Sequence, residues 1–177
     1  MKTPEYLEYD GHLLHWRNPR DGERPASYKA TSGLPDHQVP SDQCLKEMGP
    51  VPAGKYRVIL NRDIGPAQTE SPDSCTLRPA RGIQSVPRGG PCEGIWANWG
   101  NNRARFEAAD EHTKHVCPNL RSGFYLHDST KGYSHGCIEV ENAFFNRLYF
   151  YCLVAITHYL ELRVKYSHAT TYGGTRA

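Results

Sequence analysis

The sequence predicts an α+β fold that is mainly β: a sandwich or open barrel of short strands with one packed helix near the C-terminus. Glycine and proline are abundant, at 16 and 13 of 177 residues. They divide the chain into short segments that alternate polar and apolar residues, as strands do. A single segment in the last third places its apolar residues at helical spacing. These observations favour a β-rich, loop-rich domain over a helical bundle.

The first sixty residues predict short strands joined by tight turns. Segments 5–10, 12–16 and 28–31 alternate in polarity or are rich in β-forming residues. The Asp-Gly pair between the first two is typical of a hairpin turn. A turn rich in proline and glycine then leads into 55–60, KYRVIL, which predicts a further strand.

The middle of the chain changes character. Residues 61–91 are rich in Pro, Gly, Ser and Arg and show little periodicity. Because this stretch lacks an apolar set of its own, we interpret it as an insertion or lid within a single catalytic domain that spans 1–167. Strands are expected to resume at 95–100 and 103–107.

The C-terminal third predicts two short strands, the helix and a last strand. Strands at 123–126 and 137–140 flank a glycine-containing loop. The helix is predicted over 142–156, with Asn142 as its N-terminal cap. A final strand is expected at 160–166, and the remaining residues, 168–177, are expected to form a flexible tail.

Charge and hydropathy exclude several classes of protein. The formal net charge is +2 and the basic residues are scattered, so no nucleic-acid partner is expected. The longest apolar run, 148–156, is far shorter than the ~20 residues of a membrane-spanning helix. The N-terminus has neither the apolar core nor the cleavage site of a secretory signal. We therefore expect a protein made in the cytosol that does not use the general secretion route.

The six cysteines leave the redox state open. If Cys137 stays a free thiol, the other five allow at most two disulfides, and the pairing cannot be deduced. Cys75, Cys92 and Cys117 lie in loop-like sequence, where disulfides are plausible in an oxidising compartment. The alternative is that all thiols are reduced in a cytosolic protein. Cys152 falls on the predicted helix and is interpreted as a core residue.

The segment 123–140, GFYLHDSTKGYSHGCIEV, points to nucleophilic chemistry. A thiol has an ordinary pKa of ~8.5 and attacks as its thiolate, so it needs a nearby base or backbone amides. His127 ends one predicted strand and Cys137 begins the next, so a folded-back loop brings imidazole to thiol. Gly136 permits close approach of a substrate carbonyl, and the N–H groups of Gly136 and Cys137 are candidate oxyanion donors.

Residues 127–140, HDSTKGYSHGCIEV, resemble the signature of the L,D-transpeptidase catalytic domain. Upstream, SYKATSG and GPVPAGKYRV are similar to strands of the same family. The resemblance implies a peptidoglycan stem peptide as substrate and an acyl-enzyme on Cys137. It also implies His127 as general base, a site-shaping turn of Ser134, His135 and Gly136, and a backbone carbonyl near Asp128 that orients the histidine.

Two departures from the family pattern narrow the resemblance. The loop between histidine and cysteine is short, and Glu139 stands where Arg or Asn is frequent. These features resemble the branch of effectors that bacteria deliver into competitors by type VI secretion. That branch implies L,D-carboxypeptidase activity or D-amino-acid exchange in the periplasm of a Gram-negative target. It also implies a cognate immunity protein and a carrier component of the secretion system as partners.

Further site residues follow less directly. His135 either contacts substrate or thiolate, or makes a structural hydrogen bond within its turn. Arg121 is a candidate for a substrate carboxylate, or else a solvated arginine. Aromatic residues near the motif either line the cleft or belong to the core. The full set of candidate substrate-binding residues is Ser134, Tyr125, Arg121, Trp99 and Asp128.

Two other functions compete with the cysteine enzyme. His112, His115 and Cys117 have ligand-like spacing, and residues of the motif itself could chelate zinc, which would make a zinc-dependent peptidoglycan hydrolase. A non-catalytic cell-wall-binding module is the other alternative, with 61–91 as its binding segment. The cysteine mechanism needs neither a metal nor a cofactor, and none is expected.

Overall fold

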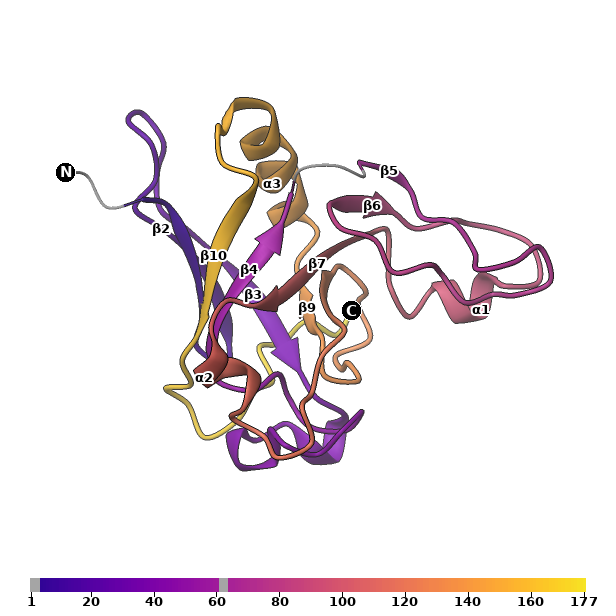
Figure 1. Ribbon diagram of the computed structural model, residues 1–177, viewed down its shortest axis with the longest axis horizontal. Helices are drawn as coiled ribbons and strands as arrows, with labels where there is room; N and C mark the ends of the chain where they lie inside the picture. The colour runs from indigo at the N-terminus through magenta and orange to yellow at the C-terminus, as the bar shows by residue number, and fades with distance from the viewer. Residues whose placement is uncertain (1–3, 61–63) are drawn as a thin grey trace.

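The computed structural model describes residues 4–60 and 64–177, and the fold within these ranges is mainly β (Figure 1). Residues 61–63, the start of the predicted insertion, lie outside the described residues. The strands are β1 (Tyr6–Tyr9), β2 (Leu13–Arg17), β3 (Ala26–Ser32), β4 (Gly54–Ile59), β5 (Gly65–Pro66), β6 (Ile83–Ser85), β7 (Asn102–Ala108), β8 (Phe124–His127), β9 (Ile138–Val140) and β10 (Tyr159–Val164). The α-helices are α1 (Glu93–Trp96), α2 (Glu111–Lys114) and α3 (Ala143–Val154), and two short 3₁₀ turns lie at Pro35–His37 and Pro40–Asp42.

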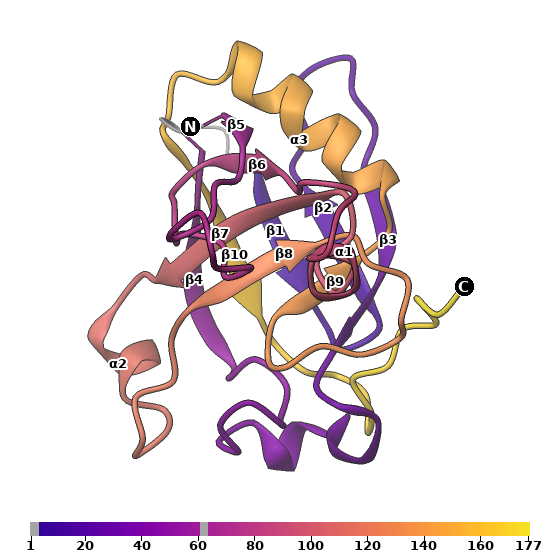
Figure 2. The same ribbon diagram turned by 90° about the vertical axis from the view of Figure 1, so that its right-hand side faces the viewer.

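The sheet closes on itself. Its strand order is β4-β10-β1-β2-β3-β9-β8-β7-β6-β5, and β4 also pairs with β7. Eight strands therefore form a ring from β4 round to β7, while β6 and β5 extend from the free part of the β7 edge. The predicted mainly β fold is confirmed, with a barrel-like arrangement of its strands (Figure 2).

The core fills this ring and continues beneath α3. Alternate residues of the strands point inward, and the cluster includes Leu7, Leu14, Val58, Phe106 and Leu162, all nearly inaccessible to solvent. Burial of such side chains is the main favourable contribution to folding, at roughly 25 cal/mol per Å² of apolar surface. Figures 1 and 2 show α3 lying across one end of the barrel.

The predicted helix is confirmed with different details at its start. Phe144, Phe145 and Leu148 are buried, and Phe144 packs against Trp16 and Tyr28. Asn142 precedes the helix as expected, but its side chain makes no capping hydrogen bond. Among the residues that the structure describes, no helix is both long and apolar enough to span a membrane.

A lobe built from residues 64–101 projects from the barrel (Figure 1). The expected strand at 95–100 is wrong, because this stretch forms α1 and a following turn. Trp96 and Trp99 are three residues apart and pack on a small cluster of Ala67, Leu77 and Val86. The lobe thus has an apolar set of its own, which the sequence reasoning did not find. That it acts as a lid stays a prediction.

Residues 168–177, expected to form a flexible tail, pack against β3 in the structure. Thr171 is buried, its N–H donates to the carbonyl of Gln38, and its carbonyl accepts from the N–H of Ser32. The N–H of Ala177 donates to the carbonyl of Thr130. These long-range contacts bring the tail alongside the loop between β8 and β9.

Candidate active site

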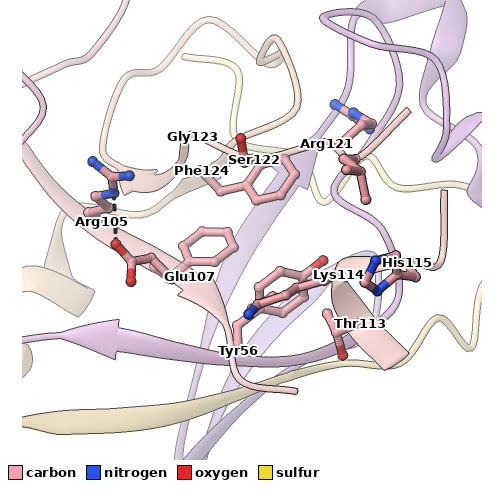
Figure 3. A pocket seen from close by; sticks show the side chains of 13 residues that line it. Tyr56, Arg105, Glu107, Thr113, Lys114, His115, Arg121, Ser122, Gly123 and Phe124 are labelled. Atoms are coloured by element: carbon pink, nitrogen blue, oxygen red, sulfur yellow. Dashed lines mark ion pairs between the residues drawn. The ribbon is translucent and has the colours of Figure 1, made fainter. Parts of the chain in front are cut away.

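The thiol and the imidazole that the motif singled out line one cavity. This cavity has a volume of about 110 Å³, and its walls are Asn98, Trp99, His127, Tyr133, Ser134, His135 and Cys137. A larger cavity of about 480 Å³ opens between α2 and the β7–β8 pair (Figure 3). The smaller cavity is the candidate active site, because it alone of the two contains the nucleophile and the base.

Strand geometry explains why the two groups line the same cavity. Strands β8 and β9 are parallel, with Leu126 opposite Ile138 and His127 opposite Glu139. Side chains alternate between faces along a strand, so His127 and Glu139 share the face away from the core. Cys137 directly precedes β9 and lies two residues before Glu139, which makes it a diagonal neighbour of His127.

A polar row crosses the outer face of five neighbouring strands. In register from β3 to β6, it consists of Thr31, Glu139, His127, Arg103 and Gln84. All five are buried. Polar groups this deep require hydrogen-bond partners, so the row constrains the orientation of the histidine within it.

His127 is held on several sides. Its Nδ1 lies 3.1 Å from the hydroxyl of Ser129, and its ring meets the Trp99 indole edge-on at a centroid distance of 5.6 Å. Burial lowers the pKa of His127 to about 4; the Asp128 carboxylate and a backbone contact with Trp99 oppose this shift, and Arg103 adds to it. The imidazole is therefore neutral at neutral pH, which is the form that accepts a proton. The orienting groups are the Ser129 hydroxyl and the Trp99 backbone rather than a carbonyl near Asp128.

Cys137 is a free, partly exposed thiol. Burial raises its pKa to about 11, against lowering by a backbone contact with Tyr125 and by the charges of Arg103 and Arg121. The resting pair is consequently a neutral thiol beside a neutral imidazole. Such a pair needs the histidine as a base, because little thiolate exists in advance.

The serine of the SHGC motif organises the turn. The Ser134 hydroxyl donates to the carbonyl of Cys137 and accepts from the N–H of Gly33 at 3.2 Å. Ser32 donates to the same Cys137 carbonyl at 2.7 Å. The N–H of Gly136 points toward Ser134 Oγ at 3.4 Å, so in this conformation it is directed into the turn and not at an oxyanion. Ser134 thus contacts backbone, although it also lines the cavity.

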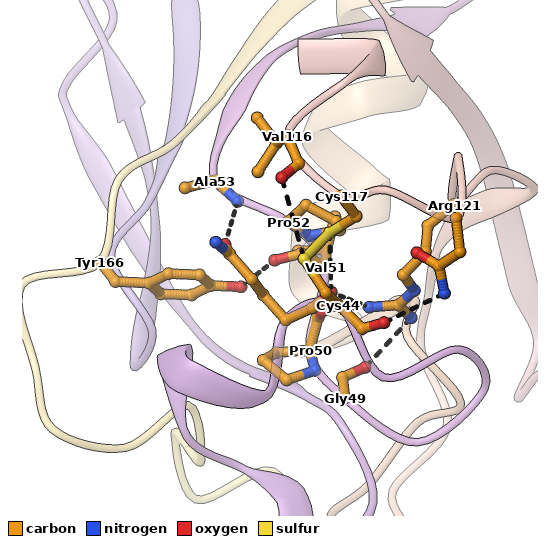
Figure 4. Close-up of a disulfide and its surroundings, with 12 residues drawn as sticks. Cys44, Gly49, Pro50, Val51, Pro52, Ala53, Val116, Cys117, Arg121 and Tyr166 are labelled. Carbon is orange, nitrogen blue, oxygen red and sulfur yellow. Dashed lines mark hydrogen bonds between the residues drawn. A yellow bond between two sulfur atoms is a disulfide. The ribbon is translucent and has the colours of Figure 1, made fainter. Parts of the chain in front are cut away.

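Arg121 does not reach out to a substrate carboxylate. Its guanidinium donates to three backbone carbonyls, those of Gln43, Gly49 and Pro50 (Figure 4). The disulfide between Cys44 and Cys117 joins the two loops that meet there. Arg121 therefore fixes the loop beneath the SHGC turn and acts on Cys137 through its charge.

Gly136 is expected to tolerate no side chain. Its φ is +110°, and a Cβ would lie 2.1 Å from the Arg121 guanidinium, whose three carbonyl contacts prevent it from moving away. We expect Gly136→Ala to lower the free energy of unfolding by about 2 kcal/mol, measured by urea denaturation. Gly123→Ala is the matched control, since Gly123 also has a positive φ but has open space at its Cβ position. Equal losses in both variants would rule out the contact with Arg121 as the cause.

The remaining candidate residues divide into those at the cavity and those below it. His135 lines the cavity and is exposed, with Nδ1 3.2 Å from the carbonyl of Glu47, so its contact in the structure is to backbone. Trp99 lines the cavity. Tyr125 is buried under Trp99 at a centroid distance of 5.0 Å and is not part of the cavity wall.

Asp128 is a structural carboxylate. It is buried and accepts hydrogen bonds from the N–H groups of Asn101 and Asn102 and from the side-chain amides of Asn102 and Asn142. This use of Asn142 explains why it does not cap α3. The expectation that Asp128 binds substrate is not met by this geometry, because its oxygens face these donors.

Sequence reasoning missed Arg103 and Ser129 and saw Glu139 only as a departure. Arg103 is 2% exposed, stacks over the rings of Trp99 and Tyr125 at 4.6 and 4.4 Å, and donates to Gln84. A signal existed for Glu139, since it lies two residues after Cys137 and so on the same face of β9. Arg103 carries no local signal, because only the register of β7 against β8 brings it beside His127.

The cysteines resolve into two disulfides and two thiols. Cys44 pairs with Cys117 and Cys75 pairs with Cys92. Cys137 and Cys152 are the free cysteines of the described residues, and Cys152 packs half-buried against the core. With Cys117 in a disulfide, the spacing of His112, His115 and Cys117 does not describe a zinc site. Across residues 4–60 and 64–177, no group of three His, Cys, Asp or Glu side chains has the geometry to hold a metal ion.

Burial of His127 predicts acid sensitivity. In the unfolded chain the imidazole protonates near pH 6.5, but in the folded chain only near pH 4. The unfolded state binds more protons between these values, so stability is lost as the pH falls from 6.5 to 4, by about 3 kcal/mol. Urea unfolding across this window is expected to show the loss in the wild-type protein and a flatter profile in His127→Asn. Parallel profiles would contradict a buried, neutral imidazole.

Comparison with known proteins identifies the class to which this fold and site belong. The family model of the L,D-transpeptidase catalytic domain, YkuD, matches residues 10–164. The chain therefore belongs to this family, and the domain supports peptidoglycan-modifying activity of the L,D-transpeptidase type.

One similar solved structure illustrates the shared architecture. The structure of Bdellovibrio bacteriovorus Bd1075 aligns with a TM-score of 0.50 and 16% sequence identity, covering 90% of this chain and 46% of that one. The chain thus spans less than half the length of that protein, and the likeness concerns the fold alone. No curated protein matches the chain.

Proposed function

We propose that this protein is a cysteine enzyme that attacks the bond between diaminopimelate and the terminal D-alanine of peptidoglycan stem tetrapeptides. The observation that carries the proposal is the free thiol of Cys137 in one cavity with the imidazole of His127, within an L,D-transpeptidase catalytic domain. The enzyme acts as an L,D-carboxypeptidase, exchanges the terminal D-amino acid, or does both.

The first half of the reaction forms the acyl-enzyme. His127 takes the proton of Cys137, and the thiolate attacks the diaminopimelate carbonyl carbon. The buried cation of Arg103 and the charge of Arg121 favour the negative charge that passes from sulfur to oxygen. The N–H of Cys137 is the remaining backbone candidate for the oxyanion. The carbon–nitrogen bond then breaks, and D-alanine leaves with the proton from His127.

The second half releases the peptide. Water, deprotonated by His127, attacks the thioester carbon; the C–S bond breaks, and the shortened peptide leaves with a free carboxylate while the thiol regains its proton. If the amine of an incoming D-amino acid attacks in place of water, the product is an exchanged tetrapeptide. Access of water or amine to the partly exposed thiol decides between the two outcomes.

We further propose that the protein acts as an antibacterial type VI secretion effector in the periplasm of a Gram-negative target. Two disulfides support an oxidising place of action, since such bonds form and persist outside the cytosol. Delivery to that compartment by type VI secretion would require a secretion-system carrier component. An enzyme of this kind also requires a cognate immunity protein in the cell that produces it.

The proposal is tested by product analysis. Wild-type protein and Cys137→Ala are incubated with disaccharide-tetrapeptide, and released D-alanine is measured by mass spectrometry, with and without an added D-amino acid. Release by the wild type alone, blocked by iodoacetamide and unaffected by a chelator, is the expected result. Blocking by the chelator while iodoacetamide spares the reaction would favour a zinc hydrolase. Retained binding without turnover in either protein would favour a cell-wall-binding module.

A further inference from the structure

Glu139 is the most completely enclosed charged residue beside the candidate active site. It is 0% exposed and lies directly opposite His127 across the β8–β9 pair. Its carboxylate accepts from the N–H groups of Lys131 at 3.1 Å and Gly132 at 2.9 Å, both in the loop that leads to Cys137. The hydroxyls of Ser129 and Thr175 contact its two oxygens. Four donors satisfy a carboxylate, so Glu139 acts as an acceptor throughout.

This arrangement sets the direction of the hydroxyl proton of Ser129. A serine hydroxyl has one proton, and here it points to the Glu139 carboxylate. Ser129 Oγ then offers only a lone pair to Nδ1 of His127, 3.1 Å away. With this direction Nδ1 carries the imidazole proton, and Nε2 keeps its lone pair provided that the Trp99 backbone, the other polar contact of the ring, accepts from the same N–H.

We propose that Glu139 is a positioning residue, which through the hydroxyl of Ser129 holds His127 in the tautomer that can accept a proton at Nε2. The proposal rests on the proposed function insofar as it gives His127 the role of base. It assigns a purpose to the residue at which this chain departs from the family pattern. The Glu139–Ser129–His127 chain adds a side-chain orienting contact to the one that the Trp99 backbone makes with the ring.

The C-terminal segment completes this chain from the opposite side. Thr175 Oγ1 donates to Oε1 of Glu139 and lies 2.9 Å from Thr31 Oγ1. Thr31 Oγ1 accepts from the N–H of Gly173. Thr31 is the neighbour of Glu139 in the register of β3 and β9. The segment near Thr175 thus holds the Glu139 carboxylate from the side of β3. Through Glu139 and Ser129 it also constrains the orientation of His127.

The test uses two readouts on the full chain: kcat and KM for D-alanine release, and the rate of Cys137 alkylation by iodoacetamide at pH 7 without substrate. Alkylation is followed by peptide mass, which separates Cys137 from the other free cysteine, Cys152. Ser129→Ala and Glu139→Gln are each expected to lower kcat by about 10- to 100-fold, with KM changed by less than about twofold. Alkylation of Cys137 is expected to slow by about tenfold or more in both variants.

A double variant and a neighbouring control complete the design. Because Ser129 and Glu139 act in series, the kcat and alkylation rate of the double variant are expected to lie within about threefold of those of the less active single variant. Thr130→Ala, an exposed side chain next to Ser129, is expected to behave as wild type. Circular dichroism establishes that each variant is folded, and Ser129→Ala serves alone if Glu139→Gln does not fold.

The outcomes separate this proposal from the proposed function. Wild-type alkylation in Ser129→Ala, a loss confined to KM, or multiplying losses in the double variant would each overturn the positioning role. If no protein releases D-alanine but the alkylation pattern holds, the substrate assignment fails and the positioning role stands.

Discussion

Replacing His127 with alanine is expected to lower kcat/KM for tetrapeptide cleavage by about 10³- to 10⁴-fold at pH 7. The size of this loss in kcat/KM follows from the Cys137 thiol, which the variant keeps. Burial holds the pKa of Cys137 at about 11, so at pH 7 about one molecule in 10⁴ carries a thiolate without help from a base. The loss is bounded by this fraction, because a variant without the imidazole still reacts through the spontaneous thiolate.

The same reasoning gives the variant a distinct pH profile. Its residual rate should rise about tenfold for each pH unit between 7 and 10, as the thiolate population rises toward the pKa of Cys137. The wild-type profile should be much flatter over this range, because an imidazole with a pKa of about 4 is already fully in its basic form. Both profiles are measured with the same tetrapeptide substrate.

His135 provides the matched control for this experiment. It lines the same cavity, but it is exposed and contacts a backbone carbonyl. We expect His135→Ala to lose less than about tenfold and to keep the wild-type pH profile. A large loss in His135→Ala combined with near-normal activity in His127→Ala would exchange the roles of the two histidines.

The parts of the fold that could be predicted are those written in local patterns. Alternating segments predicted most strands, and helical spacing predicted α3. The prediction for 95–100 failed because IWANWG is rich in residues that favour strands, whereas Trp96 and Trp99 pack together on the lobe from a helical turn. Local propensity does not capture this packing, since the deciding contacts come from residues 67, 77 and 86.

The candidate site likewise has features that local sequence patterns predict and features that depend on contacts distant in the chain. That Cys137 and His127 share one cavity could be predicted, because the motif places both within eleven residues of sequence. The uses of Arg121 and Asp128 could not, because their partners are loop carbonyls and amides distant in the chain. For both residues a charged side chain near a motif suggested substrate binding, and burial instead turned each into a hydrogen-bonding centre for backbone.

Asp128 is accordingly the position where we expect the largest loss of stability. Asp128→Ala removes the acceptor for two backbone N–H groups and two side-chain amides, all near the join of β7, β8 and α3. Side-chain amides can turn elsewhere, but the N–H groups of Asn101 and Asn102 would lose their acceptor in a part-buried site. At about 1–3 kcal/mol for each such group, the free energy of unfolding should fall by about 3–5 kcal/mol.

Asp128→Asn separates the lost charge from the lost acceptor. One oxygen of Asp128, Oδ1, receives both backbone N–H groups, and an amide oxygen in the same place would keep them. The new amide nitrogen would face the Asn142 side chain, which can flip to present its oxygen. We therefore expect Asp128→Asn to lose only about 1–2 kcal/mol, and Asp36→Ala, an exposed aspartate, to lose less than about 0.5 kcal/mol in the same urea titrations. If Asp128→Asn is as unstable as Asp128→Ala, the charge of Asp128, and not its acceptor geometry, holds these elements together.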